Sequence, residues 1–437
     1  MREDSMFVAD CLDVNEAGHL TIGGADTVSL AKEWGTPLYV FDEETIRNTL
    51  KSYKNSIDRF YDGKGLVAYA SKAFSCREMY RIVNDEGCGI DVVSQGELYT
   101  ALSVGFPVEK MFYHGNNKTL KELIYAIENN VGRIVVDNVT ELENISSIAK
   151  SQNKNVDIMF RIKPGIDAHT HDFVRTGQID SKFGFALETG EAMEAVRYAI
   201  KQDNVNLKGI HCHIGSQIFD VDPFVLAAEV MMNFIVDIYR ETGHLLTELN
   251  LGGGFGIKYI AEHNPVSYEN YMEQVSKTVH EICKKNGIEV PYIVIEPGRS
   301  VVGSSGITLY TVGAIKEIKG IRTYVSIDGG MTDNPRYIMY RSQYEAVVAN
   351  RAALQRDTAI TLAGRCCESG DLIGEGMMLQ NPQVGDIVAV LATGAYNYSM
   401  SSNYNRVQKP SAIMVKDAKS REIIRRESLD DLIKNDL

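Results

Sequence analysis

The sequence predicts an α/β protein in which a (β/α)8 barrel is joined to a mostly antiparallel β domain built from both chain ends. The chain has 437 residues, which is too long for one compact core. Eight strand-like runs alternate with helical patterns between residues 65 and 300. After residue 305 the strand-like runs are separated by turns rather than by helical patterns, which is typical of an antiparallel sheet.

The eight expected barrel strands are short, apolar and rich in β-branched residues. They are residues 65–71, 89–94, 111–115, 133–138, 155–162, 207–215, 248–254 and 292–298. Strands that alternate with helices pair in parallel, and eight such units in roughly 250 residues match a closed barrel. An open doubly wound sheet is the alternative, which the count of eight and the missing nucleotide-binding fingerprint both disfavour. We therefore expect the barrel over residues 36–305.

The β domain is expected to combine residues 1–35 with residues 306–437. Its C-terminal part contains runs such as TLYTVGAIKEI (308–318) and DIVAVLATG (386–394), which are bounded by turn residues. The N-terminal segment FVADCLDVNEAGHLTIGG (7–24) has the pattern of a strand or hairpin. We expect the two chain ends to meet in this one domain.

The composition disfavours several kinds of partner. A formal net charge of −13 argues against nucleic acid and anionic membranes, because both reward clustered Lys and Arg. No apolar run approaches the ~20 residues that span a bilayer, and the N-terminus MREDSMFVAD lacks the pattern of a signal peptide. Seven scattered cysteines without a CxxC pair predict neither a disulfide framework nor a zinc site. We expect a soluble, cytoplasmic protein.

Four groups of functional residue types fall at the ends of expected barrel strands. They are Lys72, the pair His211 and His213, the run Gly252 to Gly254, and the turn from Glu296 to Arg299. Each has an ordinary explanation when taken alone, since a lysine after a strand is usually solvated and a glycine run usually makes a tight turn. Carboxyl ends of barrel strands meet at one mouth, so together these groups predict a common site there.

The chemistry of these groups distinguishes two kinds of site. The two histidines of HCHIGSQ (211–217) face the same way on a strand and could hold a metal. No further ligand stands out at other strand ends, and His169 and His171 lie on a polar loop, so we expect no metal. A planar cofactor with a phosphate, a ring nitrogen and a carbonyl group would instead use the glycines, the glutamate and the lysine. Pyridoxal phosphate has all three features.

The chain resembles the fold-type III pyridoxal phosphate-dependent decarboxylases over nearly its whole length. Nine motifs carry the resemblance in family order: AYASKA (68–73), RIKPGIDAHTH (161–171), DSKFGF (180–185), HCHIGSQ (211–217), NLGGGFG (250–256), EPGR (296–299), DGGMTDNPRYIMY (328–340), GRCCESGD (364–371) and AYNYSMSSNYN (395–405). The resemblance implies a carboxy-lyase that converts meso-diaminopimelate to L-lysine and CO2, the last step of lysine biosynthesis.

The resemblance also assigns roles to individual residues. It implies that Lys72 is catalytic and carries the cofactor on its amine, whereas Lys182 is a loop lysine without a fixed strand register. Cofactor contacts are implied for Lys72, His213, Ser216, Gly254, Glu296, Pro297, Gly298, Arg299 and Tyr396. Among these, His213 is expected to stack on the ring and Glu296 to pair with the pyridine nitrogen. Substrate contacts are implied for Arg299, Arg336, Tyr340, Glu368 and Tyr396.

Two residues of GRCCESGD carry the discriminating chemistry. By the resemblance, Cys367 is the catalytic proton donor to the α-carbon, while Cys366 is expected to be a buried structural thiol. Glu368 matches the residue that recognises the distal amino group of the substrate. An aspartate follows the cysteine in the related ornithine decarboxylases, so Glu368 favours the longer meso-diaminopimelate. In the family these residues reach the site of the other subunit, which implies a homodimer with shared active sites.

Two alternatives to this function keep the same fold. The substrate could be arginine, ornithine, carboxynorspermidine or a D-amino acid, and Glu368 together with DGGMTDNPR argues against these. The chain could also be a cofactor-binding regulator without activity, and the presence of both Lys72 and Cys367 argues against that.

A further expectation concerns the loop from Asp167 to Phe183, which follows the fifth strand and should overhang the site as a lid.

Overall fold

The computed structural model describes residues 6–166 and 181–437, which divide into two compact units. The β-rich unit comprises Met1–Asn48, Ile257–Asn264 and Arg299–Leu437, and the barrel unit comprises Thr49–Gly256 and Pro265–Gly298. Most of the loop expected to act as a lid, residues 167–180, lies outside the described residues.

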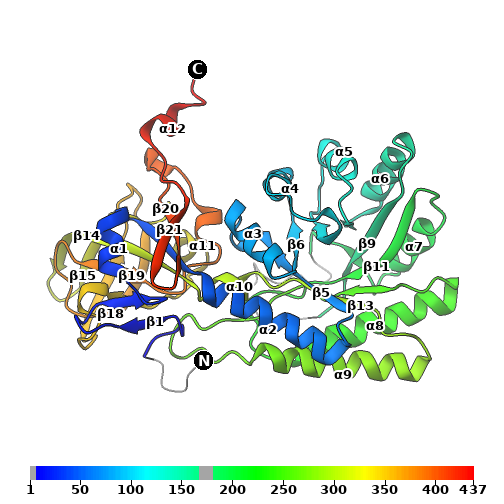
Figure 1. The fold of residues 1–437 in the computed structure, drawn as a ribbon, viewed down its shortest axis with the longest axis horizontal. Coiled ribbons are helices and arrows are strands. Elements are labelled where there is room, and N and C mark those ends of the chain that lie inside the picture. Colours follow the sequence, from blue (N-terminus) through cyan, green and yellow to red (C-terminus); the bar gives the residue numbers. More distant parts are fainter. Residues whose placement is uncertain (1–5, 167–180) are drawn as a thin grey trace. The chain divides into compact units, whose positions relative to one another are not determined.

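The barrel unit contains eight parallel strands, each paired with two neighbours so that the sheet closes (Figure 1). The strands are β5 (Gly65–Ala70), β6 (Gly89–Val92), β7 (Met111–Tyr113), β8 (Arg133–Val136), β9 (Val156–Lys163), β11 (Val205–His211), β12 (Glu248–Asn250) and β13 (Tyr292–Ile295). A short strand, β10 (Phe185–Ala186), pairs with β9. All eight expected strands are present, and the prediction of a closed barrel is confirmed.

Helices connect successive barrel strands and cover the sheet (Figure 1). They are α3 (Arg77–Asp85), α4 (Gln95–Leu102), α5 (Leu120–Glu128), α6 (Val139–Ser151), α7 (Glu191–Ala199), α8 (Asp222–Thr242) and α9 (Tyr268–Asn286), with α2 (Glu43–Tyr61) preceding β5. Side-chain caps at Ser94, Thr119 and Asn138 begin three of these helices, because each accepts a hydrogen bond from the third residue of its helix.

The barrel interior is filled by side chains that point inward from several strands. Ala68, Phe112, Val135, Met159 and Val294 form one buried cluster. Since side chains alternate along a strand, the residue two positions after each of these also points into the barrel, one layer nearer its carboxyl end. This layer contains the polar residues described below.

The β-rich unit is built around the long strand β14 (Gly306–Ile318). Its main sheet has the order β18-β17-β15-β14-β4-β20-β21, and β19 pairs with both β14 and β16. The other strands are β4 (Leu38–Asp42), β15 (Arg322–Ile327), β16 (Ala346–Val348), β17 (Thr358–Ala363), β18 (Leu372–Leu379), β19 (Ile387–Val390), β20 (Ser411–Lys416) and β21 (Lys419–Ile424). Most pairs are antiparallel, while β4–β20 and β15–β17 are parallel.

Smaller elements complete the β-rich unit. They are the three-stranded sheet β1 (Leu12–Val14), β2 (Leu20–Ile22) and β3 (Ala25–Asp26), and the helices α1 (Thr27–Trp34), α10 (Arg299–Val302), α11 (Arg336–Tyr340) and α12 (Leu429–Ile433). Strand β4 pairs with β14 and β20. The barrel was expected to start at residue 36, but β4 lies after that residue and belongs to the β-rich sheet. A fully buried run such as LYVFD has the same sequence pattern in either kind of sheet, so the pattern does not show which sheet it joins.

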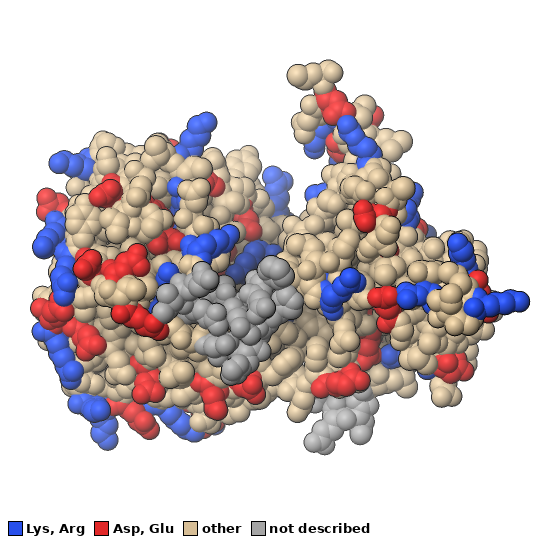
Figure 2. Space-filling model, turned by 180° about the vertical axis from the view of Figure 1, so that it is seen from behind, with Lys and Arg blue, Asp and Glu red and all other residues tan. Residues whose placement is uncertain are grey.

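Acidic and basic side chains are interspersed over the face drawn in Figure 2. The excess of 58 acidic over 45 basic residues is therefore not gathered into one broad region of that face. No helix among the described residues has the length and apolar composition needed to cross a membrane.

A buried ion pair joins the loop after β7 to helix α6. The Lys118 ammonium donates hydrogen bonds to the carbonyl oxygens of Gly115 (2.8 Å) and Val135 (2.7 Å) and to Oε1 of Glu141 (2.6 Å). Burial lowers the pKa of Lys118 and raises that of Glu141, and their mutual contact opposes both shifts. Each charge therefore depends on the other for its stabilisation.

Replacing Lys118 with methionine is expected to destabilise the protein by about 3–5 kcal/mol, because it leaves the Glu141 carboxylate buried without its partner. Urea unfolding followed by circular dichroism measures this loss. The exposed neighbour Lys121 provides the control, since Lys121→Met should change stability little. A Lys118→Met/Glu141→Leu double variant should recover most of the loss, and a single variant as stable as the control would contradict the expectation.

Candidate active site

Lys72 follows β5 in a single 3₁₀ turn, Ser71–Ala73. Its two neighbours in this turn are buried, whereas Lys72 is exposed. The end of β5 is fixed by a backbone hydrogen bond from the Ala70 N–H to the Pro297 carbonyl (3.1 Å). Gly298 packs against the same strand end, where a Cβ would lie 2.9 Å from the Ala70 Cβ. The turn after β13 and the lysine after β5 are thus held side by side.

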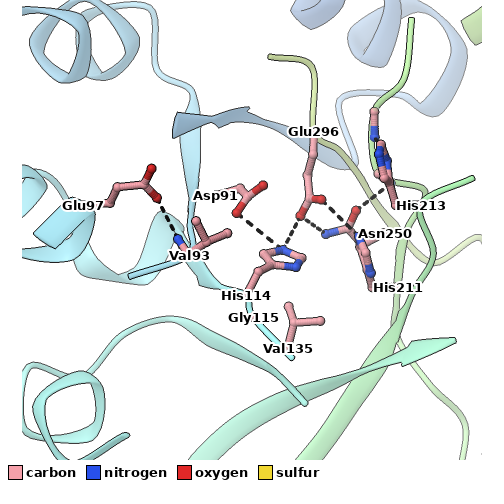
Figure 3. Close-up of polar contacts among 12 residues, drawn as sticks. Asp91, Val93, Glu97, His114, Gly115, Val135, His211, His213, Asn250 and Glu296 are labelled. Atoms are coloured by element: carbon pink, nitrogen blue, oxygen red, sulfur yellow. Dashed lines mark hydrogen bonds and ion pairs between the residues drawn. The ribbon is translucent and has the colours of Figure 1, made fainter. Parts of the chain in front are cut away.

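Glu296 follows β13 and is buried in the barrel mouth with three hydrogen-bond donors (Figure 3). Its Oε1 accepts from Nε2 of His114 (2.7 Å) and from Nδ2 of Asn250 (2.6 Å), and its Oε2 accepts from Nε2 of His211 (3.1 Å). Burial alone would raise the pKa of the Glu296 carboxyl, but His114 and His211 outweigh it and hold that pKa well below its usual range. The group is therefore an anion.

His211 and Asn250 have defined hydrogen-bonding roles in this cluster. Burial lowers the pKa of His211 to about 4 although Glu296 opposes the shift, so the imidazole is neutral at pH 7 and donates through Nε2. The Asn250 side chain is oriented at both ends, because its Oδ1 accepts from the Gly252 N–H (2.9 Å) while its Nδ2 donates to Glu296. Asn250 thereby links the glycine run to Glu296.

His213 faces a different partner from His211. Its Nδ1 accepts a hydrogen bond from the Gly253 N–H (3.4 Å), which places the ring hydrogen on Nε2. Burial, with a contribution from the nearby charge of Lys72, lowers the pKa of His213 well below its usual value. The ring is therefore neutral.

The glycine run after β12 is required by close approach of three strand ends. A Cβ at Gly252 would lie 2.5 Å from the Cys212 carbonyl oxygen, one at Gly253 2.1 Å from that of Glu296, and one at Gly254 2.6 Å from that of Gly215. Gly252 (φ +65°) and Gly254 (φ +117°) also adopt left-handed conformations. The backbone of this run therefore lies beside that of the loop containing Ser216, where the Ile218 N–H donates to the Gly254 carbonyl (3.0 Å).

A metal ion is a poorer occupant of this cluster than an organic cofactor. The ligand atoms of His114, His211 and Glu296 lie within 4.8 Å of one another. The imidazoles, however, contact the carboxylate directly at hydrogen-bonding distances, and His213 bonds to a glycine N–H instead of joining them. The expectation that His211 and His213 do not act as a metal-binding pair fits this arrangement.

Pyridoxal phosphate fits the barrel residues. A carboxylate offers about four acceptor positions, and three of those on Glu296 are filled by the described residues. The remaining position on Oε2 matches a protonated ring nitrogen. The exposed Lys72 amine suits a carbonyl group, and the glycine-lined backbone after β12 suits a phosphate.

Four of the expected substrate and cofactor residues lie together in the β-rich unit. The Arg299 guanidinium donates to the Tyr259 hydroxyl (2.7 Å) and lies 4.9 Å from the centroid of the Tyr396 ring. The Arg336 guanidinium lies 5.3 Å from the same ring and 4.9 Å from that of Tyr340. Both arginines are buried, and such guanidiniums suit carboxylate recognition.

Cys367 and Glu368 lie on an exposed loop of the β-rich unit. The Cys367 N–H donates to Oδ1 of Asn405 (2.8 Å). Asp371 braces the same loop, since it accepts hydrogen bonds from the N–H groups of Cys366 (2.7 Å) and Met331 (2.6 Å). Cys366, expected to be a buried thiol, is half-buried, and burial raises its pKa to about 11.

The comparisons with known proteins identify the family. The model of a family described as pyridoxal-dependent decarboxylase, pyridoxal binding domain, matches residues 43–303. A diaminopimelate decarboxylase from Bacillus subtilis (strain 168) is 45% identical over 435 residues, which are 99% of this chain and 98% of that protein. The chain belongs to the diaminopimelate decarboxylase family.

Two further relatives agree with this assignment. A diaminopimelate decarboxylase from Bacillus methanolicus is 46% identical over 424 residues, covering 97% of this chain and 98% of that protein. The crystal structure of a diaminopimelate decarboxylase from M. jannaschii in complex with L-lysine has a TM-score of 0.93, 35% identity and 99% coverage of both chains. The predicted family, fold class and pyridoxal cofactor are confirmed.

Three residues of the buried cluster around Glu296, namely Asp91, His114 and Asn250, were not predicted from the sequence. His114 lies two residues after Phe112, which points into the barrel. Residues two apart on a strand point the same way, so the inward direction of His114 could have been predicted. Asn250 is the first residue of the motif NLGGGFG, but no role was predicted for it. The contact of His114 with Glu296 joins residues 182 positions apart, and local sequence patterns do not specify it.

Proposed function

We infer that this chain catalyses the pyridoxal phosphate-dependent decarboxylation of meso-diaminopimelate to L-lysine and CO2, the last step of lysine biosynthesis. The observation that carries this inference is the ionised Glu296 carboxylate. It accepts hydrogen bonds from three donors and keeps one acceptor position open. When bound, the cofactor supplies a protonated pyridine ring that accepts the electrons left by the departing carboxylate. An anionic partner keeps that ring nitrogen protonated.

The barrel residues hold the cofactor in this proposal. Lys72 binds it covalently through its amine, Glu296 pairs with the ring nitrogen, and the neutral His213 lies against the ring face. The phosphate is bound by Ser216, Gly254 and the turn Glu296, Pro297, Gly298 and Arg299. The backbone N–H groups of a glycine-lined turn provide donors without side chains in the way.

The β-rich unit supplies substrate recognition and the returning proton. meso-Diaminopimelate carries an ammonium and a carboxylate at each end. Arg299, Arg336, Tyr340 and Tyr396 are proposed to bind and orient it, with the guanidiniums gripping carboxylates. Glu368 binds the distal ammonium, and Cys367 delivers a proton to the α-carbon after the carboxylate has left.

We propose that the active unit is a homodimer with shared active sites in the cytoplasm. Cys367 and Glu368 are exposed on a braced loop, as expected of groups that complete a site on a second copy. An isologous dimer then contains two such sites. All seven cysteines are free thiols, which suits a reducing compartment.

The substrate assignment is tested by incubating the purified protein and pyridoxal phosphate separately with meso-diaminopimelate, L,L-diaminopimelate, ornithine and arginine. We expect CO2 and L-lysine from the meso isomer, at a kcat/KM at least about a hundredfold above that for ornithine, because ornithine leaves the groups for the distal carboxylate unpaired. Release from ornithine or arginine alone would overturn the assignment. Stoichiometric zinc without a visible chromophore would favour a metal-dependent hydrolase instead.

A further inference from the structure

A chain of buried polar side chains crosses the barrel mouth from Asp91 in β6, through His114 after β7, to Glu296 after β13 (Figure 3). Nε2 of His114 lies 2.7 Å from Oε1 of Glu296 and 3.9 Å from Oδ1 of Asp91. The strand order is β13-β5-β6-β7, so His114 reaches Glu296 past two intervening strands.

The backbone fixes the direction of the His114 side chain. Its N–H donates to the Val92 carbonyl (2.8 Å), which extends the β6–β7 pairing by one residue. Phe112 points into the barrel core, and His114, two residues later, points the same way. Its ring packs edge-on against that of His211, with centroids 4.7 Å apart.

Contacts with His114 determine how Glu296 presents its carboxylate. Oε1 accepts from both His114 and Asn250, which fills its two acceptor positions, whereas Oε2 accepts from His211 alone among the described residues. Without the His114 contact, Oε1 would regain an open position, and the carboxylate could rotate or bind the cofactor through either oxygen.

His114 also separates two buried carboxyl groups. Oδ1 of Asp91 has no hydrogen-bond partner among the described residues. Burial raises the pKa of Asp91, His114 opposes that shift, and Glu296 reinforces it. Without the imidazole, Glu296 would keep only Asn250 and the neutral His211 as donors while still facing Asp91, and two like charges in one site raise the pKa of at least one of them.

We propose that His114 is a positioning residue that keeps Glu296 anionic and correctly oriented for the ring nitrogen of the cofactor. This inference rests on the proposed role of Glu296. Besides the residues named above, the titratable groups whose charges act on this cluster include Lys72, Glu97, Asp137, Arg161, Cys212 and His213. None of them stands in for His114, because none is hydrogen-bonded to the Glu296 carboxylate among the described contacts.

The expected consequence is a change in pH dependence. In the native protein His114 and His211 hold the pKa of the Glu296 carboxyl well below its usual range, against the effect of burial. Loss of His114 raises its pKa, so Glu296 takes up a proton as the pH falls through that higher value and no longer holds the ring nitrogen protonated. The acidic limb of activity, and the acidic transition in the visible spectrum of the bound cofactor, both move to higher pH.

The experiment compares His114→Phe, which removes the donor, with His114→Gln, which keeps a neutral donor at the position of Nε2. Glu296→Gln tests the group through which His114 acts. The control is His280→Gln, since His280 is an exposed residue of the barrel unit whose hydrogen bond among the described residues is to the Phe60 carbonyl, at 2.9 Å. The readouts are the Kd for pyridoxal phosphate added to apoprotein, the spectrum of the bound cofactor against pH, and kcat and KM separately.

For His114→Phe we expect the acidic transition to rise by about one pH unit or more and the Kd to rise about tenfold. We also expect kcat to fall about tenfold with KM changed less than about twofold, as for a group acting on the reacting system rather than on substrate binding. His114→Gln should show the same changes at a smaller size, about half a pH unit, and it keeps the test valid if the Phe variant does not fold.

Three results would overturn the inference, and each can be told from the others. If Glu296→Gln alters the spectrum but both His114 variants match the control, His114 has no positioning role and the proposed role of Glu296 stands. If Glu296→Gln leaves the spectrum and Kd unchanged, the proposed role of Glu296 fails and the role of His114 fails with it. A fall in stability of both His114 variants with unchanged pH transitions would show a merely structural contribution.

Discussion

Replacing Lys72 with alanine is expected to abolish decarboxylation and the covalent retention of pyridoxal phosphate. Lys72 is exposed in the turn after β5, and that turn is held against the backbone after β13. The amine is therefore presented at the barrel mouth, where its charge acts on Asp91 and His213. Without it, the rate should fall by at least about a thousandfold, because no other group at this strand end can bind the carbonyl of the cofactor.

Borohydride reduction followed by mass spectrometry measures the covalent link. The native protein should gain the mass of one reduced cofactor on the peptide that contains Lys72, and Lys72→Ala should gain none. Lys182 supplies the matched control, because it is an exposed lysine of the same unit whose ammonium lies 5.1 Å from the Phe183 ring centroid. Lys182→Ala should retain both label and activity, and a label on Lys182 in the Lys72→Ala protein would reverse the two roles.

The sequence predicted the barrel because each strand and its following helix carry local signals. Apolar β-branched runs marked all eight strands, and the functional residue types at their ends marked the mouth. Lys72, His213 and Glu296 were predicted as site residues in this way, since strand ends converge in a closed barrel whatever the details of packing.

The contacts that tune these residues could not be predicted in the same way. His114 looked like the last residue of an apolar strand, and only closure of the barrel brings it to Glu296, past β5 and β6. The boundary expected at residue 36 left residues 38–42 with the barrel, whereas β4 pairs with β14 and β20 of the β-rich sheet. The contact of His114 and the sheet that β4 joins both depend on partners far away in the sequence. Local sequence patterns do not specify such partners.

Replacing Cys367 with alanine is expected to leave the cofactor bound and to stop turnover. The thiol is exposed, and backbone N–H groups of the loop are bound by the side chains of Asn405 and Asp371, so the substitution removes the proposed proton donor without disturbing the fold. Loss of a general acid should lower kcat by about a hundredfold to ten-thousandfold. The spectrum and the borohydride-fixed label on Lys72 should stay native, which separates this variant from Lys72→Ala.

The neighbouring thiol provides the control for this prediction. Cys366 is half-buried, and burial raises its pKa to about 11, so Cys366→Ala should keep most of the native kcat. Equal loss in both variants would indicate damage to the loop, and loss in Cys366→Ala alone would move the catalytic assignment to that residue.

Co-expression of the two inactive variants then tests where Cys367 acts. If each site combines Lys72 of one copy with Cys367 of another, random pairing makes half of the dimers mixed, and one site of each mixed dimer carries neither substitution. About a quarter of the native activity should therefore return in the mixture, as the symmetry of an isologous dimer requires. No recovery, despite mixed dimers demonstrated with two affinity tags, would place Lys72 and Cys367 of the same copy in one site. Recovery would identify the exposed loop from Cys366 to Asp371 as the part of the chain that completes its partner's active site.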